Sequence, residues 1–202
     1  YGPSGTGKSE YVHWLAKRLD RPLVQKKGSD LISKWLGETE RNIATAFEEA
    51  EANDAVLLLD EIDSFLQDRS HSVCSWEVTQ VNELLTQMES FNGLLVATTN
   101  LVDTMDKAAL RRFDAKVKFN YLTEDQRLVA FMNLCAEMEL THPDHQNEHL
   151  LADLDNLTMG DFASLRRRNR FSPIRKTHDL INALIKESEL KSDGHQRKIG
   201  FH

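Results

Sequence analysis

The sequence predicts a doubly wound α/β domain followed by a smaller, all-helical domain. Helix and strand signals alternate up to about residue 120, which is the pattern of a parallel sheet flanked by helices. Beyond residue 121, apolar side chains recur only at the spacing of helices. We therefore expect an α/β domain over residues 1–121 and a helical domain over residues 122–202.

The elements of the first domain follow from local patterns. A glycine-rich loop opens a helix over residues 8–19, and a polar stretch leads into a second helix over residues 38–52. The apolar run at 55–59 is continuous, which is typical of a strand covered on both faces. The alternation is completed by a helix at 76–88 and by strands at 22–25, 94–98 and 115–119.

The second domain shows two apolar helical patterns, one around residues 128–138 and one around residues 180–185. The polar stretch 141–148 is expected to link the first helices of this domain. The segment from Thr158 to Asp161 looks like a helix start. No internal repeat or low-complexity segment interrupts the pattern.

The glycine-rich loop fits the phosphate-binding pattern G-x-x-x-x-G-K-[ST] at every fixed position. Its glycines would let backbone N–H groups wrap the phosphates, with the positive end of a helix dipole behind them. Lys8 would reach the β and γ phosphates, and the Ser9 hydroxyl would ligate Mg²⁺. An ordinary glycine-rich turn is the alternative. The loop consists of Gly2, Pro3, Ser4, Gly5, Thr6, Gly7, Lys8 and Ser9.

Two adjacent acids follow the apolar run, at the end of the strand where open α/β sheets bind ligands. Asp60 is placed to hold Mg²⁺, usually through water, and Glu61 to orient and deprotonate the attacking water. Acidic residues that cap a following helix are the alternative. Loop and acids together predict a nucleoside triphosphatase that uses Mg²⁺.

Composition limits the other classes of function. With 32 acidic and 25 basic side chains, the average charge disfavours nucleic acid and weakly favours a protein partner. Cys74 and Cys135 lie far apart in no metal-ligand spacing, which indicates reduced thiols and a cytoplasmic protein without a zinc site. No run of 18 apolar residues suggests a membrane segment.

Because Tyr1 directly precedes a loop that normally follows a buried strand, we expect that strand to be missing and the chain to be a fragment.

Five further segments bear on the kind of nucleoside triphosphatase. They are Ser33-Lys34-Trp35-Leu36-Gly37-Glu38, the acidic motif extended from Asp60 to Arg69, Val96-Ala97-Thr98-Thr99-Asn100, the run from Asp106 to Asp114 that contains Arg111 and Arg112, and Leu157-Thr158-Met159-Gly160-Asp161-Phe162-Ala163. With the phosphate loop, they resemble the AAA-type ATPases, specifically the group that contains spastin, katanin, Vps4-like ATPases and the bacterial SpoVK-type proteins. The resemblance covers nearly the whole chain.

The resemblance implies roles for these segments. Asn100 would bind the attacking water or the γ-phosphate, Gly160 would lie near the adenine, and the helical domain would be a lid. Arg111 and Arg112 resemble the arginine fingers that act on a neighbouring subunit, although the family's Pro-Gly between the two arginines is absent here. Two arginines on a solvated turn are the alternative. Arg69 would contact a neighbouring subunit.

The segment around Trp35 resembles the family's pore loop. Lys34, Trp35, Leu36 and Gly37 would then grip a threaded polypeptide, with Gly37 providing the bend. A hydrophobic staple formed by Trp35 is the alternative. The implied function is Mg²⁺-dependent ATP hydrolysis that remodels, unfolds or disassembles a protein through the pore of a homo-oligomeric, hexameric ring.

Two other functions remain open. A nucleic-acid remodeller such as a helicase loader would stack bases on Trp35 and hold the backbone with the basic run 166–170. A regulatory ATP switch would assemble without threading a substrate.

Overall fold

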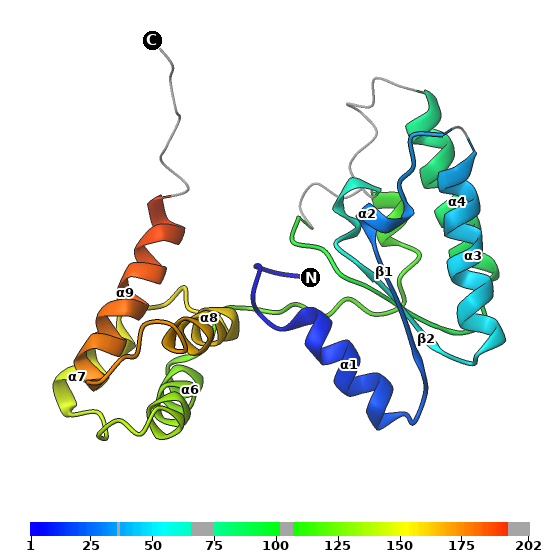
Figure 1. Ribbon diagram of the computed structural model, residues 1–202. Coiled ribbons are helices and arrows are strands. Elements are labelled where there is room, and N and C mark those ends of the chain that lie inside the picture. The colour runs from blue at the N-terminus through cyan, green and yellow to red at the C-terminus, as the bar shows by residue number, and fades with distance from the viewer. Residues whose placement is uncertain (36, 66–74, 102–106, 194–202) are drawn as a thin grey trace, which may run out of the picture. The chain divides into compact units, whose positions relative to one another are not determined.

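The computed structural model describes residues 1–35, 37–65, 75–101 and 107–193 (Figure 1). The chain forms two compact units. The first joins Tyr1–Gly2 to Lys8–Phe119, and the second joins Pro3–Gly7 to the chain from Asn120 onward. The phosphate loop therefore belongs in part to each unit.

Within the described residues, the first unit contains a parallel sheet of three strands in the order β1-β2-β3. The strands are β1 (Leu23–Lys27), β2 (Val56–Asp60) and β3 (Leu94–Ala97). The pairing places Lys27 opposite Asp60 and Leu59 opposite Ala97, so the strands end together at one edge of the sheet. The predicted doubly wound α/β class is confirmed, because parallel strands alternate with helices along this unit.

Helices cover both faces of the sheet (Figure 1). On one face, α1 (Lys8–Arg18) packs Val12 and Ala16 against Val56 and Leu58 of β2. On the other, α3 and α4 pack against the side chains of β2 that point the opposite way. Every residue of β2 is buried, as expected for a central strand with two covered faces. The two helices on this second face are α3 (Glu38–Ala52) and α4 (Ser75–Ser90). The short helical elements of the unit are α2 (Gly28–Leu31), η1 (Ile62–Ser64) and α5 (Lys107–Leu110).

The strand predicted at 115–119 is not formed, and that prediction was wrong. Among the described residues, the backbone of this segment bonds only to Tyr1: the Tyr1 amino group donates to the Val117 carbonyl at 2.8 Å, and the Phe119 N–H donates to the Tyr1 carbonyl at 2.7 Å. A strand needs a ladder of such bonds, and a single partner residue provides one rung.

The second unit packs four helices around its own apolar core. Phe131, Leu165 and Leu180 are fully buried in that core and come from three different helices. Side chains fix two of the helix starts: Thr123 accepts from the Gln126 N–H, and Asp144 accepts from the Asn147 N–H at 2.8 Å. The helices are α6 (Glu124–Glu137), α7 (His145–Ala152), α8 (Met159–Asn169) and α9 (Thr177–Asp193).

The expected polar link over 141–148 is too long. Asp144 caps α7, which already begins at His145, so only the first part of that stretch connects helices. The expected helix start at Thr158 is confirmed, because Thr158 is the N-cap of α8. Within the described ranges, no helix has the length and apolar character that a membrane crossing requires.

Candidate active site

The edge where the three strands end gathers polar groups around Asp60, the last residue of β2. Asp60 is only 7% exposed, and its Oδ1 accepts a hydrogen bond from the Ser9 hydroxyl at 2.8 Å. The same oxygen accepts from the Thr98 hydroxyl, and Oδ2 accepts from the Gln25 amide at 3.2 Å. The first turn of α1 and the end of β2 are thus joined through a hydroxyl and a carboxylate, the two oxygen donors predicted for Mg²⁺.

Lys8 lies at the same edge, with its ammonium held by two acceptors. It donates to the Gly2 carbonyl at 2.8 Å and to Oδ1 of Asn100 at 2.6 Å. Burial lowers the pKa of Lys8 below its usual value, and the nearby carboxylates of Asp60, Asp63 and Glu61 partly offset that effect. The fold therefore places the predicted phosphate-binding lysine and the predicted γ-phosphate sensor in direct contact.

Glu61 adopts an unusual backbone conformation. Its φ and ψ angles are 56° and 47°, in the left-handed region that a side chain other than glycine enters at a cost of roughly 1–2 kcal/mol. The Glu61 N–H donates to the Thr98 hydroxyl at 3.1 Å, which holds the turn after β2 in place. The side chain is exposed, as a base acting on a solvent-derived water requires.

A glycine makes this turn possible. A Cβ built on Gly28, the first residue of α2, would lie 2.6 Å from the Glu61 carbonyl oxygen. Any larger residue at position 28 would therefore push against the backbone of Glu61. This contact joins the predicted general base to the segment that leads into the predicted pore loop.

The middle of the phosphate loop has the shape that its glycines predict. Gly5 and Gly7 have φ angles of 78° and 91°, and a Cβ on Gly7 would meet no atom within 4 Å. Within the second unit, the Gly160 N–H donates to the Gly5 carbonyl at 2.8 Å. Gly160, predicted to lie near the adenine, thus lies against the loop itself. Pro3, Ser4 and Thr6 complete this part of the loop, where the Thr6 hydroxyl donates to the Pro3 carbonyl.

These residues fit ATP and Mg²⁺. Gly7, which is left-handed, leaves open space for a phosphate oxygen beside the backbone N–H groups of the loop, and Lys8, the next residue, supplies a positive charge. Ser9 and Asp60 present the hard oxygen donors that Mg²⁺ prefers. When bound, Mg²⁺ would neutralise negative charge on the phosphates.

The sequence analysis did not assign a role to four residues that contact this site, namely Gln25, Gly28, Asp63 and Thr98. Asp63 accepts from the Thr99 hydroxyl and from the Asn100 N–H at 3.2 Å, so it positions the residue predicted to sense the γ-phosphate. Thr98 had a usable signal, since it is a polar residue at the end of an apolar run. Gln25 had a similar one, as a polar side chain inside a predicted strand.

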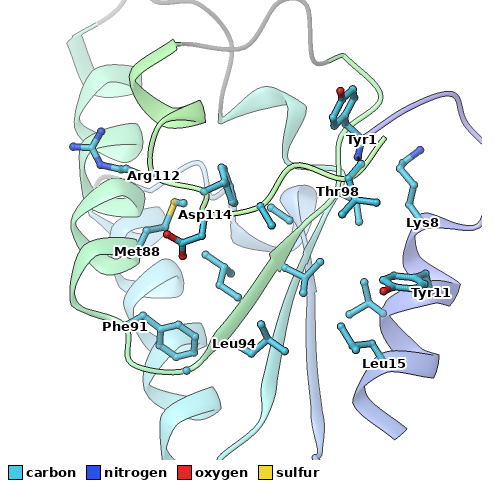
Figure 2. Close-up of a pocket in the computed structure, with 18 of the residues that line it drawn as sticks. Tyr1, Lys8, Tyr11, Leu15, Met88, Phe91, Leu94, Thr98, Arg112 and Asp114 are labelled. Carbon is cyan, nitrogen blue, oxygen red and sulfur yellow. Dashed lines mark hydrogen bonds between the residues drawn. The ribbon is translucent and has the colours of Figure 1, made fainter. Parts of the chain in front are cut away.

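A largely apolar cavity of about 390 Å³ lies beside β3 and borders this polar cluster (Figure 2). Figure 2 shows Tyr11 and Leu15 of α1 on one side, and Met88, Phe91 and Arg112 on the other. Lys8 and Thr98 of the candidate site reach its wall. The cavity follows the edge of β3 that has no strand partner among the described residues.

The model of the ATPase family associated with various cellular activities (AAA) matches residues 1–121. The chain belongs to the AAA family. Its AAA domain is an enzyme that binds and hydrolyses ATP.

Three curated relatives illustrate the similarity. The chain is 32% identical over 190 residues to the Arabidopsis thaliana Protein SUPPRESSOR OF K(+) TRANSPORT GROWTH DEFECT 1, covering 90% of this chain and 43% of that protein. It is 29% identical to the 26S proteasome regulatory subunit 6B homolog of Saccharomyces cerevisiae, covering 100% of this chain and 50% of that protein. It is 28% identical to the ATP-dependent zinc metalloprotease FtsH of Ureaplasma parvum, of which it covers 31%. The chain spans half or less of the length of these relatives.

In this AAA domain, the segment resembling a pore loop exposes its aromatic residue. Trp35 is 77% exposed, so it does not form the packed contact of a hydrophobic staple in this structure. Gly37 has a φ angle of 80° and caps α3, which accounts for the bend. Lys34 is exposed, and Leu36 lies outside the described residues.

The two candidate finger arginines of the AAA domain differ in their surroundings. Arg112 forms an ion pair with Glu89, whose Oε1 lies 2.7 Å from both Nε and Nη2 of Arg112. Arg111 is exposed and has no ion-pair or hydrogen-bond partner within the part of the chain that the structure describes. Arg69, the third residue predicted to contact a neighbour, lies outside the described residues.

Proposed function

We propose that ATP hydrolysis by this AAA domain remodels, unfolds or disassembles a protein substrate through the pore of a homo-oligomeric, hexameric ring. The observation that carries the chemical part is the convergence of Lys8, Ser9, Asp60 and Asn100 at one edge of the sheet. Lys8 would bind the β and γ phosphates, while Ser9 and Asp60 would hold Mg²⁺.

The hydrolytic step would use groups already aligned at the ends of β2 and β3. Glu61 would accept the proton of the attacking water, because its carboxylate is exposed next to the metal ligand Asp60. Asn100 would orient that water or the γ-phosphate through its amide, which its contact with Lys8 already fixes. Positioning and charge stabilisation, rather than covalent chemistry, would provide the rate enhancement.

Action on a protein is supported by the exposed loop around Trp35. This loop follows α2, whose first residue packs against Glu61, so a change at the hydrolytic site has a short path to Trp35. The Lys-Trp-Leu-Gly step favours the spastin, katanin, Vps4 and SpoVK group within the AAA family. Two relatives are named as a 26S proteasome regulatory subunit and an ATP-dependent zinc metalloprotease, and these names support a polypeptide substrate.

Hydrolysis in a ring would depend on an arginine from the neighbouring subunit. We assign this role to Arg111, because Arg112 is engaged by Glu89 of its own chain. The wide separation of Cys74 and Cys135, which indicates reduced thiols, supports a cytoplasmic location, and this location stays a prediction.

The alternative of a nucleic-acid remodeller is weaker. Within the basic run, Arg166 pairs with Glu137 at 2.7 Å and Arg168 approaches Glu187 at 3.8 Å, so these side chains do not form one free basic stripe. An acidic overall charge of −7 also opposes binding to phosphates.

The testing experiment measures ATPase rate against protein concentration for the wild type, Glu61→Gln and Trp35→Ala. Each is assayed with an unfolded protein or with single-stranded DNA. We expect a rate that rises with concentration, falls by about a hundredfold or more in Glu61→Gln, and responds to unfolded protein only when Trp35 is present. A rate independent of concentration would overturn the ring, and stimulation by DNA alone would favour the nucleic-acid remodeller.

A further inference from the structure

The middle of the phosphate loop rests directly on the first turn of α8. The Gly160 N–H donates to the Gly5 carbonyl at 2.8 Å. A Cβ added to Gly160 would lie 2.8 Å from the Gly5 Cα, and a Cβ added to Gly5 would lie 2.8 Å from the Thr158 hydroxyl. No side chain separates the two backbones, so a shift of the first turn of α8 moves Gly5 with it.

The first turn of α8 is fixed by a buried carboxylate. Asp161 is 7% exposed and accepts from the Thr158 N–H at 2.6 Å and from the Thr158 hydroxyl at 2.9 Å. Thr158 is itself 2% exposed. A carboxylate buried to this extent requires a nearby cation or several donors to remain charged.

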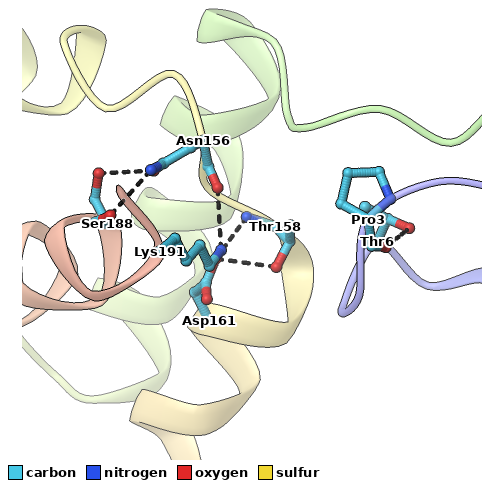
Figure 3. Close-up of polar contacts among 7 residues, drawn as sticks. All are labelled: Pro3, Thr6, Asn156, Thr158, Asp161, Ser188 and Lys191. Carbon is cyan, nitrogen blue, oxygen red and sulfur yellow. Dashed lines mark hydrogen bonds and ion pairs between the residues drawn. The ribbon is translucent and has the colours of Figure 1, made fainter. Parts of the chain in front are cut away.

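The cation comes from α9. Nζ of Lys191 lies 2.5 Å from Oδ2 of Asp161 and donates to the Asn156 carbonyl at 3.0 Å. Asn156 and Ser188 exchange two further hydrogen bonds, of 3.0 and 2.6 Å, between the same segments (Figure 3). The last turns of α9 are therefore tied to the residues that precede and begin α8.

We propose that Lys191 is a positioning residue for the phosphate loop. Through Asp161 and Thr158, it holds the first turn of α8 against Gly5 and so sets the loop geometry in which ATP binds. This rests on the proposed function of the loop as the ATP site. Loss of Lys191 leaves Asp161 without its cation, loosens the turn and weakens nucleotide binding, whereas the hydrolytic groups Glu61 and Asn100 are unchanged.

The first test needs no nucleotide. Hydrogen exchange of the backbone amides at Gly5, Gly7 and Gly160 is compared among the wild type, Lys191→Met, Lys191→Arg and the control Lys186→Met. Lys186 is exposed on the same helix and makes no contact in this network. We expect faster exchange at all three glycines in Lys191→Met, and wild-type exchange in the control. Lys191→Arg keeps the charge and is expected to restore most of the protection.

The second test separates binding from turnover. We expect Lys191→Met to raise the dissociation constant for ATP by roughly 2- to 30-fold, the range of mutations that act through a coupled network, while kcat at saturating ATP changes less than twofold. Gly160→Ala, which disturbs the loop contact directly, should weaken ATP binding as well, and the double variant should lose less than the product of the two effects.

The outcomes distinguish the two proposals. Unchanged exchange at the three glycines in a folded Lys191→Met variant overturns the positioning role, whatever the nucleotide affinity. The positioning role is also overturned if kcat of Lys191→Met falls by the same factor as its affinity for ATP. If Lys191→Met alters exchange at the three glycines but the wild type binds no ATP, the link between α9 and the loop is upheld and the proposed function is overturned.

Discussion

The Lys8 ammonium donates to Oδ1 of Asn100 at 2.6 Å, across 92 positions of the sequence. The phosphate loop and the end of β3 are thereby in contact through the two side chains expected to meet the γ-phosphate. Asp63 fixes Asn100 from the other side by accepting its backbone N–H. Asn100 is thus held through both its side-chain amide and its backbone.

This geometry predicts the behaviour of Asn100→Ala. Removal of the amide should lower kcat by about a hundredfold, the usual effect of deleting one preorganised polar group, with a smaller effect on the dissociation constant for ATP. The measurement is steady-state ATPase activity beside equilibrium ATP binding. Asn92→Ala, at an exposed position near the other end of β3, is the matched control. Equal losses in the two variants would contradict the role assigned to Asn100.

The surroundings of Arg111 and Arg112 predict different effects of replacing each with alanine. Arg111→Ala should reduce ATPase activity of the assembled protein by about 10³-fold or more, as expected for a finger that acts in trans. Arg112→Ala should break a partly exposed ion pair, with a stability change of about 0–1 kcal/mol. ATPase assays and urea unfolding of both variants provide the comparison. A larger ATPase loss in Arg112→Ala would reverse the assignment.

Gly28→Ala tests the contact between α2 and Glu61. The added Cβ would lie 2.6 Å from the Glu61 carbonyl oxygen, so one backbone must move. We expect a loss of about 1–3 kcal/mol in the free energy of unfolding and a lower kcat, since the displaced residue is the predicted base. Ser29→Ala, at the next and exposed position, should change neither quantity. If Gly28→Ala has the stability of the wild type, position 28 does not need to be glycine for α2 to pack against Glu61.

Cys135 should be chemically inert in the folded protein. It is 3% exposed, and burial raises the pKa of its thiol to about 11 from the usual 9.0. Alkylation with iodoacetamide at pH 8, followed by peptide mapping, should therefore be slow at Cys135 until the protein unfolds. As the pH rises from 9 towards 11, the unfolded thiol ionises first, so this group should progressively lower stability in that range. Rapid alkylation of the native protein would contradict the burial.

The sequence was most informative where structure depends on local patterns. The helix at 38–52 was predicted with its observed limits, because an apolar stripe follows a glycine that bends the chain. The strand predicted at 55–59 is observed one residue further on, as β2 (Val56–Asp60). Interior parallel strands are continuous apolar runs, which explains this agreement.

The predictions that were wrong or missing concern features that depend on contacts between distant parts of the chain. The segment 115–119 has strand-like composition, but its backbone pairs with no described residue other than Tyr1. Whether Gly28 touches Glu61, or Lys191 touches Asp161, depends on elements that are 30 or more positions apart in the chain and leave no local signature. The motifs predicted which residues form the nucleotide site, whereas the residues that contact them from elsewhere in the chain became visible only in the fold.

The outer edge of β3 has a practical consequence for anyone who prepares this protein. Residues 93–97 carry no charge, and the side of β3 that has no strand partner among the described residues borders an apolar cavity. Unpaired backbone groups at such an edge invite pairing with a strand of another molecule. We therefore expect the shelf life of concentrated samples to be governed by intermolecular strand pairing rather than by unfolding. A short peptide that caps this edge should then slow the growth of light scattering during storage.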